Sequence, residues 1–75
     1  MPKCDPILAT FGLRLRLQRK AKGFTQERLA EKADLDQTYI SGIERGLRNP
    51  GIKNGVRLAK ALRITTADLC KGVDA

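Results

Sequence analysis

The 75-residue sequence contains no histidine and no tryptophan, and its only aromatic residues are Phe11, Phe24 and Tyr39. The lack of histidine removes the commonest general base and a frequent metal ligand. There is also no phosphate-binding loop motif and no pairing of a nucleophile with a base, and so short a chain leaves no room for a deep pocket. We therefore expect a protein that is not an enzyme and that uses no cofactor and no metal.

Cysteine is scarce as well, because Cys4 and Cys70 are the only two. They show no CxxC spacing, which argues against a zinc site, and we interpret both as reduced thiols. No apolar run approaches the ~20 residues of a membrane span. The N-terminus lacks the basic-then-apolar order of a signal peptide. These features predict a cytoplasmic protein with no membrane partner.

The charge is strongly one-sided: 15 Lys and Arg residues against 8 Asp and Glu residues give +7. On a chain of this length such a charge indicates a polyanionic partner, either nucleic acid or a membrane surface. Mixed charges along the expected helices and few large apolar residues disfavour the membrane. The alternative at this point is a soluble basic protein whose charge serves no partner.

Apolar spacing and capping residues predict an all-α fold with five helices. The expected helices cover residues 6–22, 26–33, 36–45 and 52–62, and a short fifth helix follows residue 65. Residues 1–5 are expected to form a disordered lead-in to a single domain over residues 6–75. The expected caps at helix N-termini are Thr25, Asp36 and Thr65. In the first helix Leu13 and Leu17 form a second apolar stripe, which requires another helix or a second subunit.

The stretch "LDQTYISGIERG", residues 35–46, contains strand-forming residues and a glycine, Gly42, although its apolar residues recur at helical spacing. Together with the preceding helix and the turn at Asp34 and Leu35, it predicts a helix-turn-helix. Ala30 is the expected point of closest contact between the two helices. In this arrangement the second helix protrudes from the surface of the domain, where it can enter a major groove.

The segment "GFTQERLAEKADLDQTYISGIERGLRNPGI" resembles the Cro/C1-type (XRE) helix-turn-helix domains of phage repressors and bacterial regulators. The blocks "TQERLA", "YISGIERG" and "NP.I" carry the resemblance, which covers about Phe11 to Leu69. "LDQTYISGIERGLRN" is especially similar to the controller proteins of restriction–modification systems. The resemblance implies a five-helix lambda-repressor-like domain that regulates transcription as a dimer on double-stranded DNA. Asp34 and Gly55 depart from the family, which usually carries Gly and Leu there.

The resemblance also assigns roles to individual residues. Gln37, Thr38 and Ser41 correspond to positions that reach base edges, and Gly42 is expected to let the backbone approach the DNA. Glutamine can pair with adenine, and threonine can contact thymine. The alternative for this row is an ordinary solvated helix face. Because controller proteins often carry Arg where Gln37 stands, their operator sequence does not transfer to this chain.

Further roles concern the DNA backbone, the fold and the dimer. Contacts with the DNA backbone are expected from six residues: Thr25, Gln26, Tyr39, Arg45, Arg48 and Asn49. Arg19 and Glu44 are expected to form a structural ion pair between the first and third helices. The expected dimer contacts lie in and around the fifth helix, at Ile64, Leu69 and Val73.

Residues 25–45 carry three basic and five acidic side chains, whereas residues 46–63 carry five basic and none acidic. Attraction to phosphates must therefore come from the flanks of the helix-turn-helix, while its second helix supplies neutral polar groups that read bases. These features predict a sequence-specific transcriptional regulator, a homodimer on a pseudo-palindromic operator, of the controller or phage-repressor type. The alternative is an antitoxin-like protein-interaction module of the same fold. A long partner-binding tail would favour that alternative, and the chain ends soon after the fifth helix. No small-molecule effector is expected.

Overall fold

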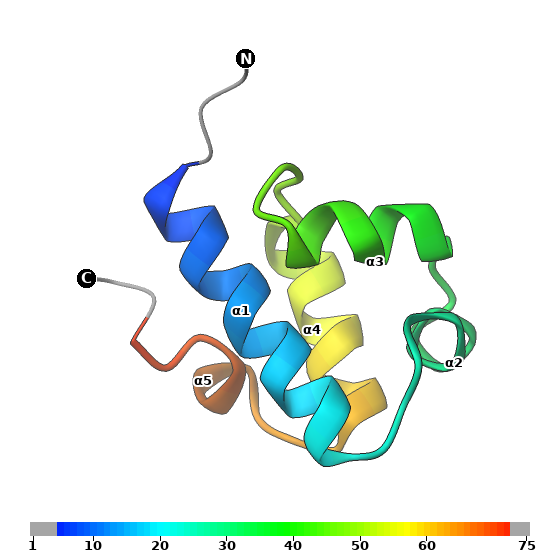
Figure 1. Ribbon diagram of the computed structural model, residues 1–75. Coiled ribbons are helices and arrows are strands. Elements are labelled where there is room, and N and C mark those ends of the chain that lie inside the picture. Colours follow the sequence, from blue (N-terminus) through cyan, green and yellow to red (C-terminus); the bar gives the residue numbers. More distant parts are fainter. Residues whose placement is uncertain (1–4, 73–75) are drawn as a thin grey trace.

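The computed structural model describes residues 5–72, and this range forms five helices and no strand (Figure 1). The helices are α1 (Pro6–Ala21), α2 (Gln26–Ala33), α3 (Gln37–Glu44), α4 (Gly51–Leu62) and α5 (Thr66–Leu69). The prediction of an all-α, five-helix domain is confirmed. Asp5, which we had assigned to the lead-in, caps α1 instead. Cys4 and Val73 lie outside the described residues.

Four of the five helices begin at a side chain that accepts a hydrogen bond from the backbone of the first turn. Such a bond satisfies one of the amides that have no partner inside the helix. The pairs are Asp5 with the amide of Ile7 (2.8 Å), Thr25 with Arg28 (3.0 Å), Asp36 with Thr38 (2.7 Å) and Thr65 with Asp68 (3.0 Å). The exception is α4, which follows Pro50 without a side-chain cap.

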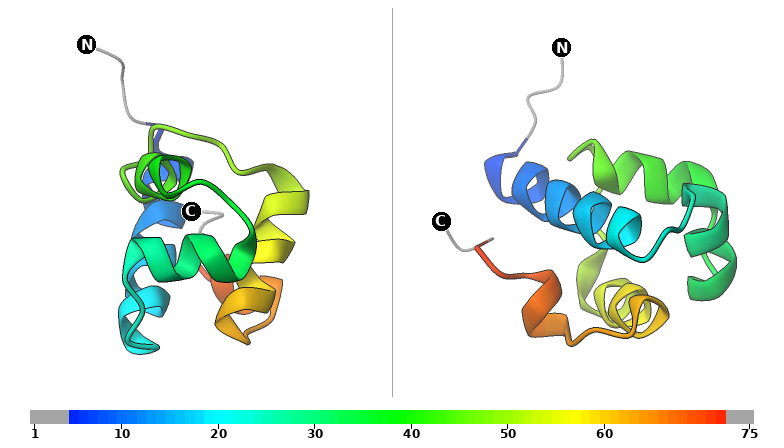
Figure 2. Two further views of the ribbon diagram at one scale, coloured as in Figure 1. Left: turned by 90° about the vertical axis from the view of Figure 1, so that its right-hand side faces the viewer. Right: turned by 60° about the horizontal axis from the view of Figure 1, so that its bottom comes forward.

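The core is built mainly from leucine, isoleucine and alanine, as the scarcity of aromatics predicted. Its buried apolar residues come from all five helices: Phe11, Leu15, Leu29, Ala30, Ala33, Ile40, Ile43, Leu58, Ala59, Leu62 and Leu69. Arg14 fastens the short α5 to α1, because its Nη2 donates to the carbonyl of Asp68 at 2.7 Å. Figure 1 shows α3 along the upper right of the domain, above α2 and α4, and Figure 2 (left) shows it end-on near the top. The packing therefore leaves α3 at the edge of the molecule.

The turn between α2 and α3 has the geometry that the helix-turn-helix requires. Asp34 adopts the left-handed conformation, with φ 56° and ψ 48°. Asp is among the few residues besides glycine that occupy this region. The amide of Leu35 then donates to the carbonyl of Ala30 at 2.9 Å, which closes the turn. The replacement of the usual glycine by Asp34 thus leaves the turn intact.

Helices α1 and α3 approach each other closely at Gly12, a residue that we did not single out in the sequence. Gly12 is buried in α1 against the C-terminal end of α3. A Cβ atom there would clash with the carbonyl oxygen of Ile43 and lie 2.7 Å from that of Glu44. Only glycine allows this spacing, because the obstacle is helix backbone rather than a movable side chain.

The second apolar stripe of α1 has no partner inside the described chain. Leu13 and Leu17 are each about half exposed.

Gly55 in α4 is buried, and a Cβ atom there would have no neighbour within 4 Å. The space beside Gly55 is therefore open.

Candidate nucleic-acid interface

The face of α3 that points away from the core carries the residues expected to read bases. Ile40 and Ile43 are fully buried, which fixes the rotation of the helix. Gln37 and Thr38 are consequently exposed at its N-terminal end, and Ser41 is half-buried one turn further on. These side chains offer amide and hydroxyl groups, the donors and acceptors that match base edges in a major groove. The structure thus brings the three residues together on one accessible row.

An ion pair holds the end of α3 against α1. Arg19 Nε donates to Glu44 Oε2 at 2.6 Å and its Nη2 to Oε1 at 3.1 Å, a two-pronged contact. The Arg19 Nη1 donates to the carbonyl of Phe24 at 2.7 Å, next to the start of α2. The two side chains are only 10% and 4% exposed. Because both charges are removed from water, this pair fixes the position of α3 rather than contacting DNA.

Gln26 joins the same cluster, because its Nε2 donates to Glu44 Oε1 at 3.2 Å. We had expected Gln26 to contact phosphate. A glutamine amide carries two N–H donors, so one remains for a phosphate while the other orients the side chain. The hydroxyl of Thr25 accepts the capping bond from the amide of Arg28 and keeps its own hydrogen for donation. Both residues are at the N-terminus of α2, where anions are stabilised by the helix dipole.

Gly42 has a close neighbour that the sequence did not predict. A Cβ atom on Gly42 would lie 2.6 Å from Cγ of Arg48 and 3.6 Å from its Cβ. The aliphatic part of Arg48 therefore occupies the space above Gly42. Arg48 is exposed, so its guanidinium remains accessible beside α3. Gly42 allows this arginine to lie across the recognition helix.

Tyr39 forms two hydrogen bonds within the chain that the sequence did not predict. Its hydroxyl donates to the carbonyl of Asn49 at 3.2 Å and accepts from Asn54 Nδ2 at 3.1 Å. A tyrosine hydroxyl has a single hydrogen, so this arrangement leaves none for a phosphate. Tyr39 thus ties α3 to α4 and to the loop between them, and it is the loop that carries Arg48. Asn54 is a residue that we missed; its only signal in the sequence is a poor helix former inside a helix.

The loop from Arg45 to Asn49 lies beside α3 and is exposed except at Gly46. Arg45 follows the last residue of α3, and Asn49 caps the next turn by accepting from the amide of Gly51 at 3.0 Å. Arg45 and Arg48 place two positive charges next to the neutral polar row of α3. This separation of charge from base-reading groups is the one that DNA recognition uses.

The residues expected at a dimer interface are only partly available. Leu69 is fully buried in the core of its own chain, and Ile64 packs against that core. The side chain of Leu69 therefore stabilises the fold and offers no surface to a second copy. With only four residues, α5 gives too little periodicity to distinguish its inner face from its outer face.

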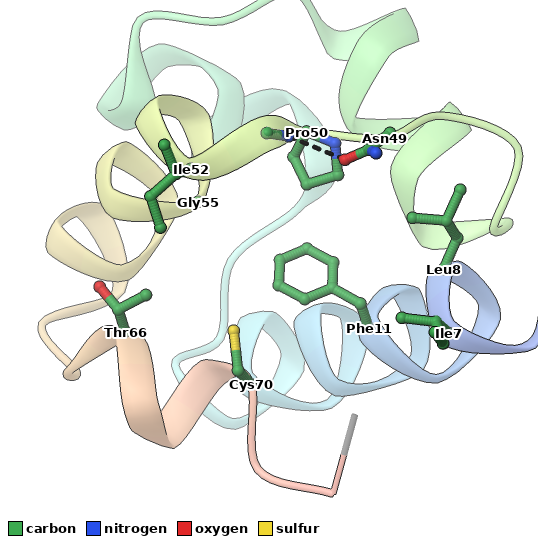
Figure 3. A pocket seen from close by; sticks show the side chains of 10 residues that line it. Ile7, Leu8, Phe11, Asn49, Pro50, Ile52, Gly55, Thr66 and Cys70 are labelled. Carbon is green, nitrogen blue, oxygen red and sulfur yellow. Dashed lines mark hydrogen bonds between the residues drawn. The ribbon is translucent and has the colours of Figure 1, made fainter. Parts of the chain in front are cut away.

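A different apolar surface lies close by. A pocket of about 300 Å³ opens between α1, α4 and α5, and Gly55 and Phe11 form part of its wall. Figure 3 shows the Phe11 ring in the middle of this space, with Ile52 and Gly55 on one side and Leu8 on the other. Ile52 is 76% exposed at the rim. The missing side chain at Gly55 is one reason why the pocket is open.

Comparisons with known proteins agree with this geometry. A helix-turn-helix family model matches residues 15–69. The chain is 45% identical to the control protein C.BamHI of Bacillus amyloliquefaciens over 84% of this chain and 79% of that protein. The crystal structure of the restriction–modification controller C.AhdI from Aeromonas hydrophila superposes with a TM-score of 0.81 at 48% identity, covering 83% of this chain and 94% of that one. The tetramer of the controller C.Esp1396I bound to its 35-base-pair operator gives 0.81 at 38% identity, covering 91% and 90%.

The chain therefore belongs to the helix-turn-helix family of the Cro/C1 type, a family of DNA-binding transcription regulators and not of enzymes. Within that family it is similar to controller proteins of restriction–modification systems. Among the described residues, no helix combines the length and the apolar character that crossing a bilayer would require.

Proposed function

We propose that this chain is a homodimeric controller of transcription that binds a pseudo-palindromic operator of the kind associated with restriction–modification genes. The row of Gln37, Thr38 and Ser41 on the outer face of α3, beside the basic loop that carries Arg48, is the observation that carries the proposal. The control proteins C.BamHI and C.MunI, which are similar along most of the chain, support the regulatory context.

The contacts divide into two kinds. Gln37, Thr38 and Ser41 supply the base contacts that determine which sequence is bound. Contacts with the phosphates come from the N-terminus of α2, at Thr25 and Gln26, and from the loop after α3, at Arg45, Arg48 and Asn49. Each half-site is thus held at both ends of the helix-turn-helix, which sets the register of α3 in the groove.

A second copy of the chain is the proposed occupant of the apolar pocket between α1, α4 and α5. Ile52 projects from the rim of the same pocket, so one surface supplies both a projecting side chain and a cavity. A two-fold axis through such a surface is self-complementary, because each Ile52 can enter the pocket of the other copy. Ile64 remains a candidate for a dimer contact. The dimer would place its α3 helices ~34 Å apart, in successive major grooves.

Selection of binding sites from random-sequence duplexes tests the proposal. The expected product is a pseudo-palindrome whose half-sites are about one helical turn, ~10 base pairs, apart. Sedimentation of the protein with the selected duplex should show two chains, or a multiple of two, per operator. Recovery of an isolated half-site bound by one chain at full affinity would contradict the dimer. No enrichment of any sequence would contradict the function itself.

One observation favours the protein-interaction alternative, namely the half-exposed Leu13 and Leu17 on α1. They lie four residues apart, so they form one stripe that a partner helix could cover. A pull-down with the wild-type chain and with a Leu13→Ser, Leu17→Ser variant distinguishes the two functions. A protein that binds only the wild type, together with no sequence preference on DNA, would favour the interaction module.

A further inference from the structure

A basic groove runs along α4, outside the surface that carries the recognition helix. Lys53, Arg57 and Lys60 follow one another at intervals of four and three residues, so their side chains form a single row on the helix. All three are exposed, and none forms an ion pair with any described residue. We define the basic groove as this row together with Lys32 at the end of α2.

The surface between α2 and α4 is hollowed along this row. One depression is lined by Ile52, Lys53, Val56 and Arg57, and the next by Lys32, Ala33, Asp34, Arg57, Lys60 and Ala61. Arg57 lines both, so the two depressions adjoin at this side chain. Lys32 lines the second depression, with its amine 5.2 Å from the centre of the Phe24 ring. Asp34 is the one acidic residue among those that line the two depressions.

Such a row opposes the stability of α4 at its N-terminal end, whereas Lys60 in the last turn is favourable for the helix dipole. Like charges four residues apart repel, and a lysine in the first turn is unfavourable for the helix dipole. The first turn of α4 contains no acidic residue and has no side-chain cap. These costs fall when a polyanion lies along the row and neutralises it. The row therefore fits an extended anion better than it fits bare solvent.

The groove begins where the proposed DNA surface ends. The loop with Arg48 and Asn49 leads through Pro50 directly into α4, so Lys53 is the first cation beyond the loop. Figure 2 (left) shows this loop crossing from α3 over the top of the domain to the start of α4, from which α4 runs away from α3. From Lys53 to Lys60 the helix rises ~10 Å, a length that spans about three successive phosphates at ~3.4 Å of axial rise per strand.

We propose that the basic groove binds the sugar–phosphate backbone of DNA that flanks the operator. The proposal rests on the proposed function, because an operator must first position the flanking DNA. The contacts carry no base information, since Lys53, Arg57 and Lys60 would each contact phosphate rather than a base edge. They add affinity and salt dependence to the complex without changing which sequence is chosen.

The test compares duplexes that differ only in their flanks. One ends at the outer edge of the selected half-sites, and the second extends by ~10 base pairs, one turn, on each side. The third has the same extension with neutral methylphosphonate linkages. Wild-type protein should bind the charged extension on the order of tenfold more tightly than the short duplex. It should gain nothing from the neutral extension.

The variant Lys53→Gln, Arg57→Gln, Lys60→Gln should lose this gain while keeping its affinity for the short duplex. On the extended duplex, the slope of log affinity against log salt should fall by about 0.9 for each phosphate that the variant no longer neutralises. The matched control removes three exposed charges elsewhere, Arg16→Gln, Lys20→Gln, Lys71→Gln, and should retain the gain.

Three results would overturn the groove. They are a wild-type protein that gains nothing from charged flanks, a groove variant that keeps the gain, and a groove variant that weakens equally on short and extended duplexes. The last two results would mean that Lys53, Arg57 and Lys60 face an acidic protein or solvent rather than flanking DNA. A failed proposed function shows separately, as equal binding of the selected and a scrambled core on the short duplex. In that case no operator positions the flanking DNA, and the groove proposal falls together with the proposed function.

Discussion

Arg48 lies across Gly42, with its Cγ at 2.6 Å from the position that a Cβ of residue 42 would occupy. The glycine is in the middle of the recognition helix, and the arginine is in the loop that follows it. The absence of a side chain at residue 42 of α3 and the placement of the Arg48 side chain are therefore linked. A substitution of Gly42 that raises the helix propensity of α3 would therefore displace the Arg48 side chain.

Gly42→Ala should weaken DNA binding without weakening the fold. Alanine favours the helix by ~1 kcal/mol over glycine, and the displaced Arg48 offsets part of that gain. Binding to selected and to scrambled duplexes should fall by similar factors, because the displaced arginine binds phosphate rather than a base. Fluorescence anisotropy on both duplexes and urea unfolding measure the two effects. In an Arg48→Ala background, Gly42→Ala should cost no further affinity; an additional loss would mean that Gly42 itself approaches DNA.

Gly12 and Gly55 are both buried helical glycines, but they should respond oppositely to alanine. At Gly12 the new Cβ meets carbonyl oxygens of α3, so Gly12→Ala should destabilise the domain by about 3 kcal/mol or more. At Gly55 the new Cβ enters open space, so Gly55→Ala should stabilise it by ~1 kcal/mol through helix propensity. Thermal unfolding of the two variants beside wild type is the measurement. Equal effects would show that the spacing of α1 and α3 is not set by Gly12.

The ion pair of Arg19 and Glu44 predicts a loss of stability on truncation. Arg19→Ala leaves the Glu44 carboxylate in a site where its side chain is 4% exposed, and it removes the donor to the Phe24 carbonyl. The expected loss in the free energy of unfolding is ~3 kcal/mol. Arg19→Lys keeps the charge but lacks the planar fork, so it should recover only part of the loss. The exposed pair Arg28 and Glu31 serves as control, and Arg28→Ala should cost less than ~1 kcal/mol.

Some parts of this structure were readable from the sequence because their causes are local. The caps at Thr25, Asp36 and Thr65 act on amides two or three residues away, and the left-handed turn at Asp34 depends on that residue's own backbone. The helix-turn-helix followed from such signals, together with the helical spacing of Ile40 and Ile43.

Other parts depend on residues that meet only in the folded chain. Gly12 has no distinctive neighbours in sequence, and its function becomes apparent only against the carbonyls of Ile43 and Glu44. The hydrogen bonds of Tyr39 with Asn49 and Asn54 join α3, the loop and α4. Because these contacts span ten or more residues, no local pattern encodes them. The sequence therefore indicated which residues surround the site, but not which of them would already form contacts within the protein.

Gln37→Ala should change specificity rather than overall attraction to DNA. Gln37 is exposed at the first position of α3, where its amide can make two hydrogen bonds with an adenine. Its loss should cost ~1–3 kcal/mol on the selected operator and little on scrambled DNA. Repeating the selection with the variant should relax one base pair in each half-site. Arg48→Ala is the contrasting variant, since it should lower both affinities and reduce the salt slope by about 1. If Gln37→Ala lowered the affinity for both duplexes equally, Gln37 would not be a residue that contacts bases.

Ile52→Lys should separate the dimer without unfolding the chain. Ile52 is 76% exposed in the single chain, so a lysine there is solvated and leaves the core intact. In the proposed dimer the same residue enters the pocket of the second copy, where an unpaired charge is strongly unfavourable. Analytical ultracentrifugation should therefore show a monomer with an unchanged helical circular dichroism spectrum. Operator binding should become weaker and lose its dependence on both half-sites. Lys53→Gln, one residue along α4, changes charge beside the pocket rim but should leave the dimer unaffected. If Ile52→Lys remains dimeric, the second copy binds elsewhere, and the exposed Leu13 and Leu17 of α1 become the next surface to substitute.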